Sequence, residues 1–266
     1  MTNLKIGIPD IPFNATRITA SNTTDDYANL YNLRGGKRSQ YVKLSSAASS
    51  CSYTFDLGNN YTSRNSQVDY LAIGRADLLG ANTVLVESSP DNATWTTRMN
   101  ITSFTSTARY GPRSEDYINT ITLTSAIRYW KITYSMSAGT NTFTHSKIGL
   151  GQLFNFSSDP NFKFYVEQAK NIYRYAKSGA AEFLRSTTPV YTFEFEWFGQ
   201  SDSVIKDFSN KLVRYADKLP VWLYTSAEHQ ILDSQRLVYA YLTHYESVRD
   251  YAGFNTIRAT FVESIG

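Results

Sequence analysis

The clearest alternation of apolar and polar positions in the chain runs from Val190 to Trp197. Aromatic residues fill every second position, at Tyr191, Phe193, Phe195 and Trp197. The positions between them are polar: Thr192, Glu194 and Glu196. A period of two is typical of a β-strand with one buried face. The pattern therefore predicts a strand with an aromatic core face and a polar second face.

A helix is predicted directly after this strand. Gly199 and Gln200 interrupt the alternation, and Ser201 or Asp202 offers an N-cap oxygen. Apolar residues then recur at spacings of one, three or four, at Val204, Ile205, Phe208, Leu212, Tyr215 and Leu219. This spacing forms one apolar stripe of an amphipathic helix over Ser203–Leu219. Pro220 ends the helix, and Val221–Tyr224 resumes as a strand. The strands and helix together are typical of a fold nucleus.

Short strands separated by turn residues fill most of the first 156 positions. They are predicted at Tyr53–Leu57, Val68–Ile73, Thr83–Glu87, Tyr117–Leu123, Arg128–Tyr134 and Lys147–Phe156. Because no segment of helical period separates them, we expect an all-β sandwich over residues 27–157. Residues 1–26, with Pro9 and Pro12, are expected to be an N-terminal arm, with a plain surface loop as the alternative.

A domain boundary is predicted at Ser157–Pro160, where short polar residues end in a proline. Further strands follow at Phe162–Val166, Ile172–Tyr175, Leu237–His244 and Asn255–Glu263. With the lone helix, residues 158–266 are expected to form an α+β sandwich. The later strands also carry tyrosines that we expect to be exposed and to make subunit contacts: Tyr239, Tyr241, Tyr245 and Tyr251.

Composition narrows the classes of function. The net charge is +3 with no basic run, which argues against a dedicated nucleic-acid surface. Cys51 is the only cysteine, so no intrachain disulfide can form and folding in a reducing compartment is favoured. We also expect no signal peptide and no membrane-spanning segment.

Candidate catalytic groups are few. The three histidines, at positions 145, 229 and 244, lack metal-ligand spacing, so neither a metal nor another cofactor is expected. Glu194 and Glu196 share a strand face, and residues two apart on a strand lie ~6.5–7 Å apart, within the range of an inverting glycosidase pair. A solvated or interface face is the favoured interpretation. We therefore expect no catalytic residues and no enzyme, with a glycosidase as the weakest alternative.

Four motifs in order resemble the discoidin-type, galactose-binding-like jelly roll. They are Phe55-Asp-Leu-Gly58, the strand Tyr70-Leu-Ala-Ile73, the turn Ser89-Pro-Asp-Asn-Ala-Thr-Trp95 and Ala126-Ile-Arg-Tyr-Trp-Lys-Ile132. Asn92 stands where that family has glycine, and asparagine is the usual substitute at a positive φ. The family's frequent cysteine pair and a calcium-binding acidic cluster have no counterpart here. The resemblance implies a jelly-roll β-sandwich over roughly residues 27–156.

The same resemblance implies a ligand site in loops at one end of the sandwich. The candidate ligand-binding residues are Arg34, Lys37, Arg38, Tyr110 and Arg113. Arginine and tyrosine together suit sugar hydroxyls or a protein partner, and polar turns are the plain alternative. On this basis a carbohydrate-binding adhesin that acts through residues 27–157 is the second functional hypothesis.

The second half resembles the tail-tube fold of bacteriophage distal-tail and related minor tail proteins, in strand order, lone helix and the segment from Gly179 to Trp197. The resemblance implies a structural protein of a phage tail tip or baseplate, located in the virion tail. Its partners would be copies of itself in a hexameric ring and the tube, hub and tape-measure proteins, with a host-surface glycan as a further ligand. DNA would be passing cargo only.

Glu194 and Glu196 would face a neighbouring subunit or the channel, where acidic groups repel DNA phosphate. The usual distal-tail order of the two domains is reversed here.

Overall fold

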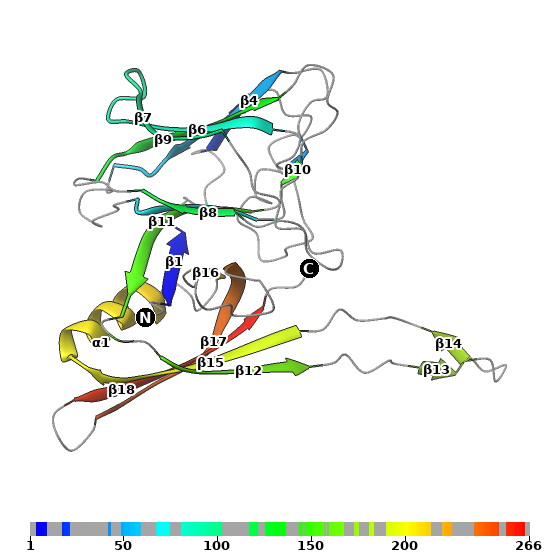
Figure 1. Ribbon diagram of the computed structural model, residues 1–266, viewed down its shortest axis with the longest axis vertical. Coiled ribbons are helices and arrows are strands. Elements are labelled where there is room, and N and C mark those ends of the chain that lie inside the picture. The colour runs from blue at the N-terminus through cyan, green and yellow to red at the C-terminus, as the bar shows by residue number, and fades with distance from the viewer. Residues whose placement is uncertain are drawn as a thin grey trace. The chain divides into compact units, whose positions relative to one another are not determined.

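The protein is mainly β, as the sequence predicts, in a computed structural model of the chain (Figure 1). The described residues are 4–9, 18–21, 42–43, 49–59, 68–74, 81–102, 117–121, 126–136, 144–145, 147–156, 158, 160–167, 173–175, 181–183, 190–213, 220–224, 237–249 and 254–263. The chain divides into two compact units. The first contains residues 1–155 and 221–239, and the second contains residues 156–220 and 240–265.

The first unit is built on two antiparallel sheets. One has the strand order β2 (Ile18–Ser21), β4 (Ser50–Asp56), β9 (Tyr129–Met136), β6 (Ala81–Ser89) and β7 (Thr96–Ile101). In the other, the order is β16 (Val221–Tyr224), β1 (Lys5–Pro9), β11 (Lys147–Asn155), β5 (Tyr70–Gly74) and β8 (Tyr117–Thr120). A short ladder joins β3 (Val42–Lys43) to β10 (Thr144–His145).

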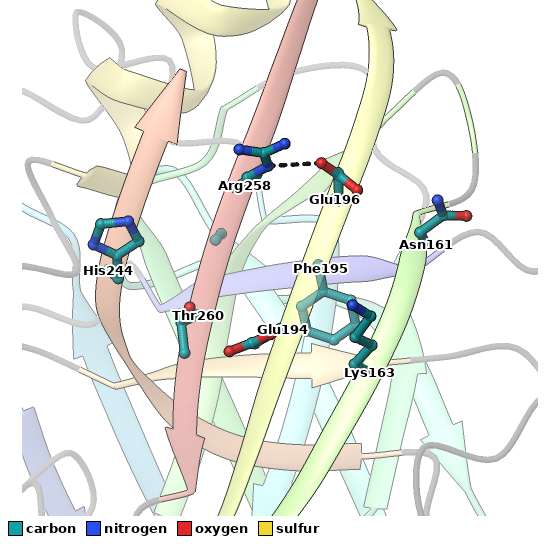
Figure 2. Close-up of a pocket in the computed structure, with 9 residues that line it drawn as sticks. Asn161, Lys163, Glu194, Phe195, Glu196, His244, Arg258 and Thr260 are labelled. Carbon is teal, nitrogen blue, oxygen red and sulfur yellow. Dashed lines mark hydrogen bonds and ion pairs between the residues drawn. The ribbon is translucent and has the colours of Figure 1, made fainter. Parts of the chain in front are cut away.

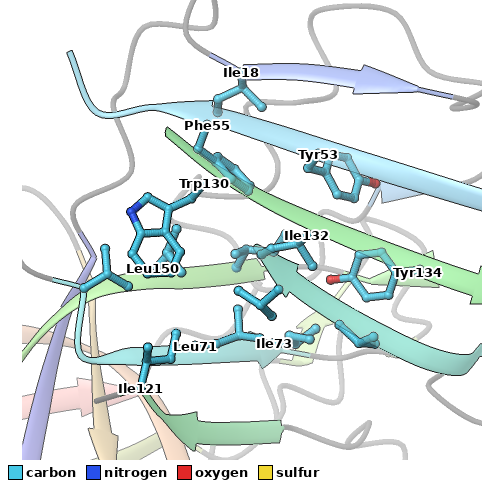
Figure 3. Close-up of a cluster of buried hydrophobic side chains, with 14 of the residues drawn as sticks. Ile18, Tyr53, Phe55, Leu71, Ile73, Ile121, Trp130, Ile132, Tyr134 and Leu150 are labelled. Carbon is cyan, nitrogen blue, oxygen red and sulfur yellow. The ribbon is translucent and has the colours of Figure 1, made fainter. Parts of the chain in front are cut away.

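The core of the first unit lies between these two sheets, whose apolar side chains point toward each other (Figure 3). Strand β4 shows the cause, because its residues alternate between buried and half-buried along the whole strand. Tyr53 and Phe55 come from one sheet and Leu71, Ile73 and Leu150 from the other, and all five are buried. The predicted β-sandwich of this part of the chain is confirmed.

Strand β11 is buried on both faces, because its first five residues are all inaccessible to solvent. On the side away from the sandwich core, Tyr70, Trp222 and Tyr239 form a second buried cluster. The indole of Trp222 lies directly on the backbone of β11, where a Cβ at Gly149 would collide with Nε1 of Trp222. Close backbone approach therefore requires glycine at this position.

Two of the sequence motifs meet in the folded protein. The carboxylate of Asp56 accepts two hydrogen bonds from Arg128, at 2.7 Å from Nε and 2.8 Å from Nη2. It also accepts from the backbone of Gly58 at 2.8 Å, and the amide of Leu57 donates to the carbonyl of Arg128 at 3.0 Å. The Phe55–Gly58 segment and the start of β9 are thus joined by a bidentate ion pair, a strong form of charge-assisted hydrogen bond.

The turn between β6 and β7 is closed by Asp91. Its carboxylate accepts from the hydroxyl of Ser89 at 2.8 Å and from the amides of Ala93 and Thr94, both at 2.9 Å. These bonds hold the pKa of Asp91 near 2, below its ordinary value. Asn92 has a φ of 62°, which confirms the positive φ expected from its place in the motif.

The second unit contains an antiparallel sheet of β12 (Asn161–Glu167), β15 (Val190–Gln200), β18 (Asn255–Glu263) and the later residues of β17 (Leu237–Arg249), in that order. The ladder of β13 (Tyr173–Tyr175) and β14 (Ala181–Phe183) lies between β12 and β15 in sequence. The predicted alternation of β15 is confirmed, because Phe193, Phe195 and Trp197 are buried.

The aromatic face of this sheet is covered by the helix α1 (Asp202–Phe208). Phe156 stacks on Trp197 with ring centroids 3.9 Å apart, and Phe208 lies 5.4 Å from Phe156. Of the two predicted N-cap candidates, Ser201 is the N-cap, and its hydroxyl accepts from the amide of Val204 at 3.4 Å. The α-helix is shorter than predicted, because a π-helical turn at Ser209–Val213 replaces its continuation.

A β-bulge at the end of β15 changes the direction of the chain as it enters the helix. The register of β15 against β18 shifts between Trp197 and Gln200, and Gly199 within the shift has a φ of 67°. Buried amides fix this corner, since Gln200 donates to the Ser158 hydroxyl at 2.8 Å and Asn255 donates to Asp202 at 2.8 Å. The glycine and the two amides thus set where the helix begins.

Several expectations differ from the structure. Residues 5–9 and 18–21, expected in an arm, are strands because Ile6, Ile8 and Ile18 are buried in the sheets that they join. The chain does not divide into consecutive blocks at 157, since residues 221–239 lie in the first unit. Tyr239, expected at an exposed face, is buried beside Trp222 with ring centroids 4.6 Å apart. Tyr251 lies outside the described residues. None of the described helices is long and apolar enough to cross a membrane.

Substituting Asn92 tests the turn. Asn92→Gly is expected to keep full stability, because glycine adopts a positive φ at no steric cost. Asn92→Ala should lower the free energy of unfolding by about 1 kcal/mol, the cost of a left-handed conformation with a plain Cβ. Urea denaturation of both variants, with Asn100→Ala in the extended strand β7 as the control, measures the difference. Equal stability of the glycine and alanine variants would contradict the role assigned to φ.

Lys147 makes stability depend on pH. Its side chain is fully buried, and burial lowers its pKa from the ordinary 10.5 to about 8. Between these two values the unfolded chain binds more protons than the folded protein, so stability rises with pH. The total gain is at most about 3 kcal/mol. Urea denaturation from pH 7 to 10.5 should show the free energy of unfolding of wild type rising with pH relative to that of Lys147→Met, because methionine does not titrate. A constant difference across this range would show that burial does not shift the lysine.

Candidate functional site

The face of the second unit's sheet opposite to the helix is polar. The strand registers place Asn161, Glu196, Arg258 and Glu246 in one row across the four strands. The next row on the same face contains Lys163, Glu194, Thr260 and His244. We call these two rows the ionic face. It follows from the period of two in β15, which puts every glutamate on the side away from Phe193, Phe195 and Trp197.

Arg258 is the centre of this face. Its Nε donates to Glu196 Oε1 at 2.6 Å, and its Nη1 lies 3.5 Å from Glu246 Oε2. The hydrogen bond that Arg258 donates to Glu196 is the largest cause of the raised pKa of Arg258, followed by the negative charges of the two glutamates. The guanidinium therefore joins strands β15, β18 and β17 from the solvent side.

A shallow depression of about 370 Å³ lies over the ionic face (Figure 2). Its polar lining comes from both rows: Asn161, Lys163, Glu194, Glu196, His244, Arg258 and Thr260. Phe195 and Ala259 complete the lining. Three carboxylates (Glu194, Glu196 and Glu246) and two permanent cations (Lys163 and Arg258) stand on this face, so its charge is mixed. The two glutamates of β15, taken alone, predict an acidic face. Within the described ranges, no group of three or more histidine, cysteine or acidic side chains could hold a metal ion.

The two glutamates of the predicted pair have different surroundings. Glu196 accepts a charge-assisted hydrogen bond from Arg258, whereas Glu194 lies in register with Lys163 in the neighbouring strand. A glycosidase needs one carboxyl group in the protonated form to act as the general acid. Glu196 instead accepts a charge-assisted hydrogen bond at 2.6 Å from the Arg258 guanidinium. The arrangement of Glu196 thus suits an ion-pair network that joins strands.

The structure brings together only some of the residues predicted as functional. Glu194 and Glu196 lie side by side on the ionic face, with Arg258, Lys163 and His244 around them. The alternation in residues 255–263 could have placed Arg258 on a polar face, but its position opposite Glu196 depends on the strand register. The candidate ligand-binding residues of the first unit, Arg34, Lys37, Arg38, Tyr110 and Arg113, lie outside the described residues.

Comparisons with known proteins find similarity in structure only. No protein-family model matches the chain, and no curated protein resembles it in sequence. One similar structure is chitosan-binding module 1 of a chitosanase/glucanase from Paenibacillus sp. IK-5, with 14% identity, a TM-score of 0.38, and coverage of 50% of this chain and 92% of the module. Another is the CBM32-1 module of a family 31 glycoside hydrolase from Clostridium perfringens, with 12% identity, a TM-score of 0.37, and coverage of 54% and 97%. A pectin-binding carbohydrate-binding module has 13% identity, a TM-score of 0.37, and coverage of 53% and 91%.

Removing the central cation tests how the ionic face is held. Arg258→Gln is expected to shift the urea midpoint only slightly, because exposed ion pairs add little to stability. Phe261→Ala, on the buried face of the same strand, should shift the midpoint much more. The small effect of Arg258→Gln should also shrink at 1 M NaCl, where charges are screened over about 3 Å. An effect of Arg258→Gln as large as that of Phe261→Ala would mean that the ion pairs contribute as much to the stability of the sheet as its buried core does.

Proposed function

We propose that this protein is a structural subunit of a bacteriophage tail tip or baseplate, and that its second unit forms a ring around the tail channel. The observation that carries the proposal is the run of four antiparallel strands β12, β15, β18 and β17, with one sealed aromatic face, one ionic face and an edge at β12 suited to pairing with a further copy. The support beside it is the resemblance of the second half of the sequence to tail-tube proteins.

The first and last strands of this run are complementary in direction. Each strand runs antiparallel to its neighbour, so β12 and β17, the first and last of these four strands, point in opposite directions. In the described part of the second unit, β12 pairs only with β15. Strand β16 follows β17 in the strand order, and it has four residues whereas β17 has thirteen. The ring of Trp222 in β16 contacts the ring of Tyr239 at the beginning of β17. Residues 244–249 of β17 pair with β18 on one side.

An even number of antiparallel strands allows the sheet to continue from copy to copy. When copies are related by rotation, β17 of one copy runs antiparallel to β12 of the next, and the same face of every sheet points to the axis. Such head-to-tail contacts close into a ring where the rotation closes. A closed sheet also removes exposed edges, which otherwise promote uncontrolled aggregation. The helix on the aromatic face leaves the ionic face for the channel.

A face of paired charges suits a channel through which a polymer passes. Because Arg258 already satisfies Glu196 and Glu246, a passing phosphate chain finds no unpaired cation of that row to bind. The surplus of carboxylates over lysine and arginine on the face weakly repels phosphate. DNA would thus be passing cargo, and the protein would not be an enzyme.

In this proposal the first unit is a binding module carried by every copy. Its ligand would be a neighbouring tail protein or a host-surface glycan, and the residues in contact with that ligand would include Arg34 and Arg113. The alternative function, an adhesin that acts through the same module, needs no ring. Assembly of the second unit therefore separates the two functions.

The oligomeric state of the full-length protein tests the proposal. Native mass spectrometry and negative-stain microscopy over a range of concentrations should show closed rings, with six copies as the expected number. The same samples treated with 1 M urea, below full unfolding, provide a control for nonspecific association, because a specific ring should dissociate in one step. A protein that stays monomeric at the highest concentration would overturn the ring and leave the adhesin as the remaining function.

A further inference from the structure

The first and last of the second unit's four strands, β12 and β17, carry opposite charges on the ionic face. Lys163 lies on β12 with its side chain exposed, and Glu246 lies on β17 with 46% of its side chain exposed. The contact of Glu246 with Arg258, at 3.5 Å, is longer than the 2.6 Å contact that Arg258 makes with Glu196. Each of these two strands thus presents one charged group toward the position that a further strand would occupy.

Only a few registers between copies keep the ionic face continuous, because the side-chain period of a strand is two. With no shift, the row that ends at Glu246 would continue at Asn161 of the next copy. A ring built with no shift would have strands parallel to its axis, whereas closed sheets require tilted strands and a register shift. A shift is therefore needed, and it must be an even number of residues.

A shift of two residues places Lys163 of the next copy opposite Glu246. The same register puts Tyr165, which is 49% exposed, opposite His244, and puts Asn161 opposite Val248. A shift of four residues would instead put Tyr165 opposite Glu246 and Lys163 opposite the apolar Val248. Cross-strand pairs of opposite charge stabilise a sheet, and a lysine opposite valine gains no such contact. The charges therefore favour the shift of two.

We propose that copies of this chain join through a β12–β17 ladder in which Lys163 of one copy lies opposite Glu246 of the next. The inference rests on the proposed ring and adds the residues that set its register. The two side chains continue the row of Glu196, Arg258 and Glu246 across the boundary between copies. The pair determines which of the possible registers the ring adopts.

Disulfide crosslinking measures the register directly. Residues directly opposite on antiparallel strands have Cβ atoms close enough for a disulfide, and those two positions away do not. In full-length protein with Cys51→Ala, the pair Lys163→Cys and Glu246→Cys should give covalent multimers on mild oxidation. The matched pair Tyr165→Cys and Glu246→Cys should remain uncrosslinked. Crosslinking of the second pair alone would overturn the proposed register in favour of a shift of four.

Charge reversal tests the energetic role of the pair. Lys163→Glu or Glu246→Lys alone should weaken association about fivefold per interface, and the double reversal should restore it. Glu246 lies 3.5 Å from Arg258 and Lys163 is in register with Glu194 within one copy, so each reversal should also lower the unfolding temperature slightly, and thermal unfolding is measured beside association. If wild type forms rings but neither cysteine pair crosslinks and reversal has no effect, the ladder is wrong while the ring stands. If wild type forms no ring, the proposed function itself fails.

Discussion

The stack of Phe156 on Trp197 decides which side of the second unit's sheet can meet a partner. With Phe208 of the helix against both rings, this contact seals one face of β15. Because strand side chains alternate, both glutamates of β15 must then lie on the other face. The ionic rows, the depression above them and the proposed channel surface all depend on this single choice of face. A helix on the opposite side would have buried Glu194 and the ion pair of Glu196 with Arg258, at a high cost in desolvation.

The two units use aromatic residues for different purposes. In the second unit, the rings cover one face of a sheet whose other face is left to charge. In the first unit, Tyr70, Trp222 and Tyr239 cover the outer side of a sheet whose inner side already faces the sandwich core. That arrangement needs backbone without side chains, and Gly7 and Gly149 supply it under Tyr70 and Trp222. The high aromatic content of the chain is therefore explained by burial on more than one layer.

Local sequence patterns predicted the positions of most strands. The pairing and register of strands that are distant in sequence could not be predicted in this way. Residues 255–263 were predicted as a strand to the residue, because alternation there is regular. The positive φ of Asn92 and the N-cap at Ser201 also follow from local chemistry. Strand β1 was missed because Lys5–Pro9 is short and contains glycine and proline, and its place depends on β11 and β16. The rows of the ionic face could not be predicted either, since register is a property of strand pairs that are distant in sequence.

The position of β1 has a consequence for synthesis on the ribosome. Lys5 pairs with Asn155 of β11 on one side and with Tyr224 of β16 on the other. Strand β1 is synthesised first, but its pairing is complete only after β16 has been synthesised. Until residues 221–224 leave the exit tunnel, one edge of β1 has no strand beside it, and the place of Trp222 on Gly149 is empty. The nascent chain therefore carries an incomplete sheet through most of translation. Slow elongation or premature termination would expose that edge to neighbouring nascent chains, which makes the late arrival of β16 the step at which misassembly is most costly.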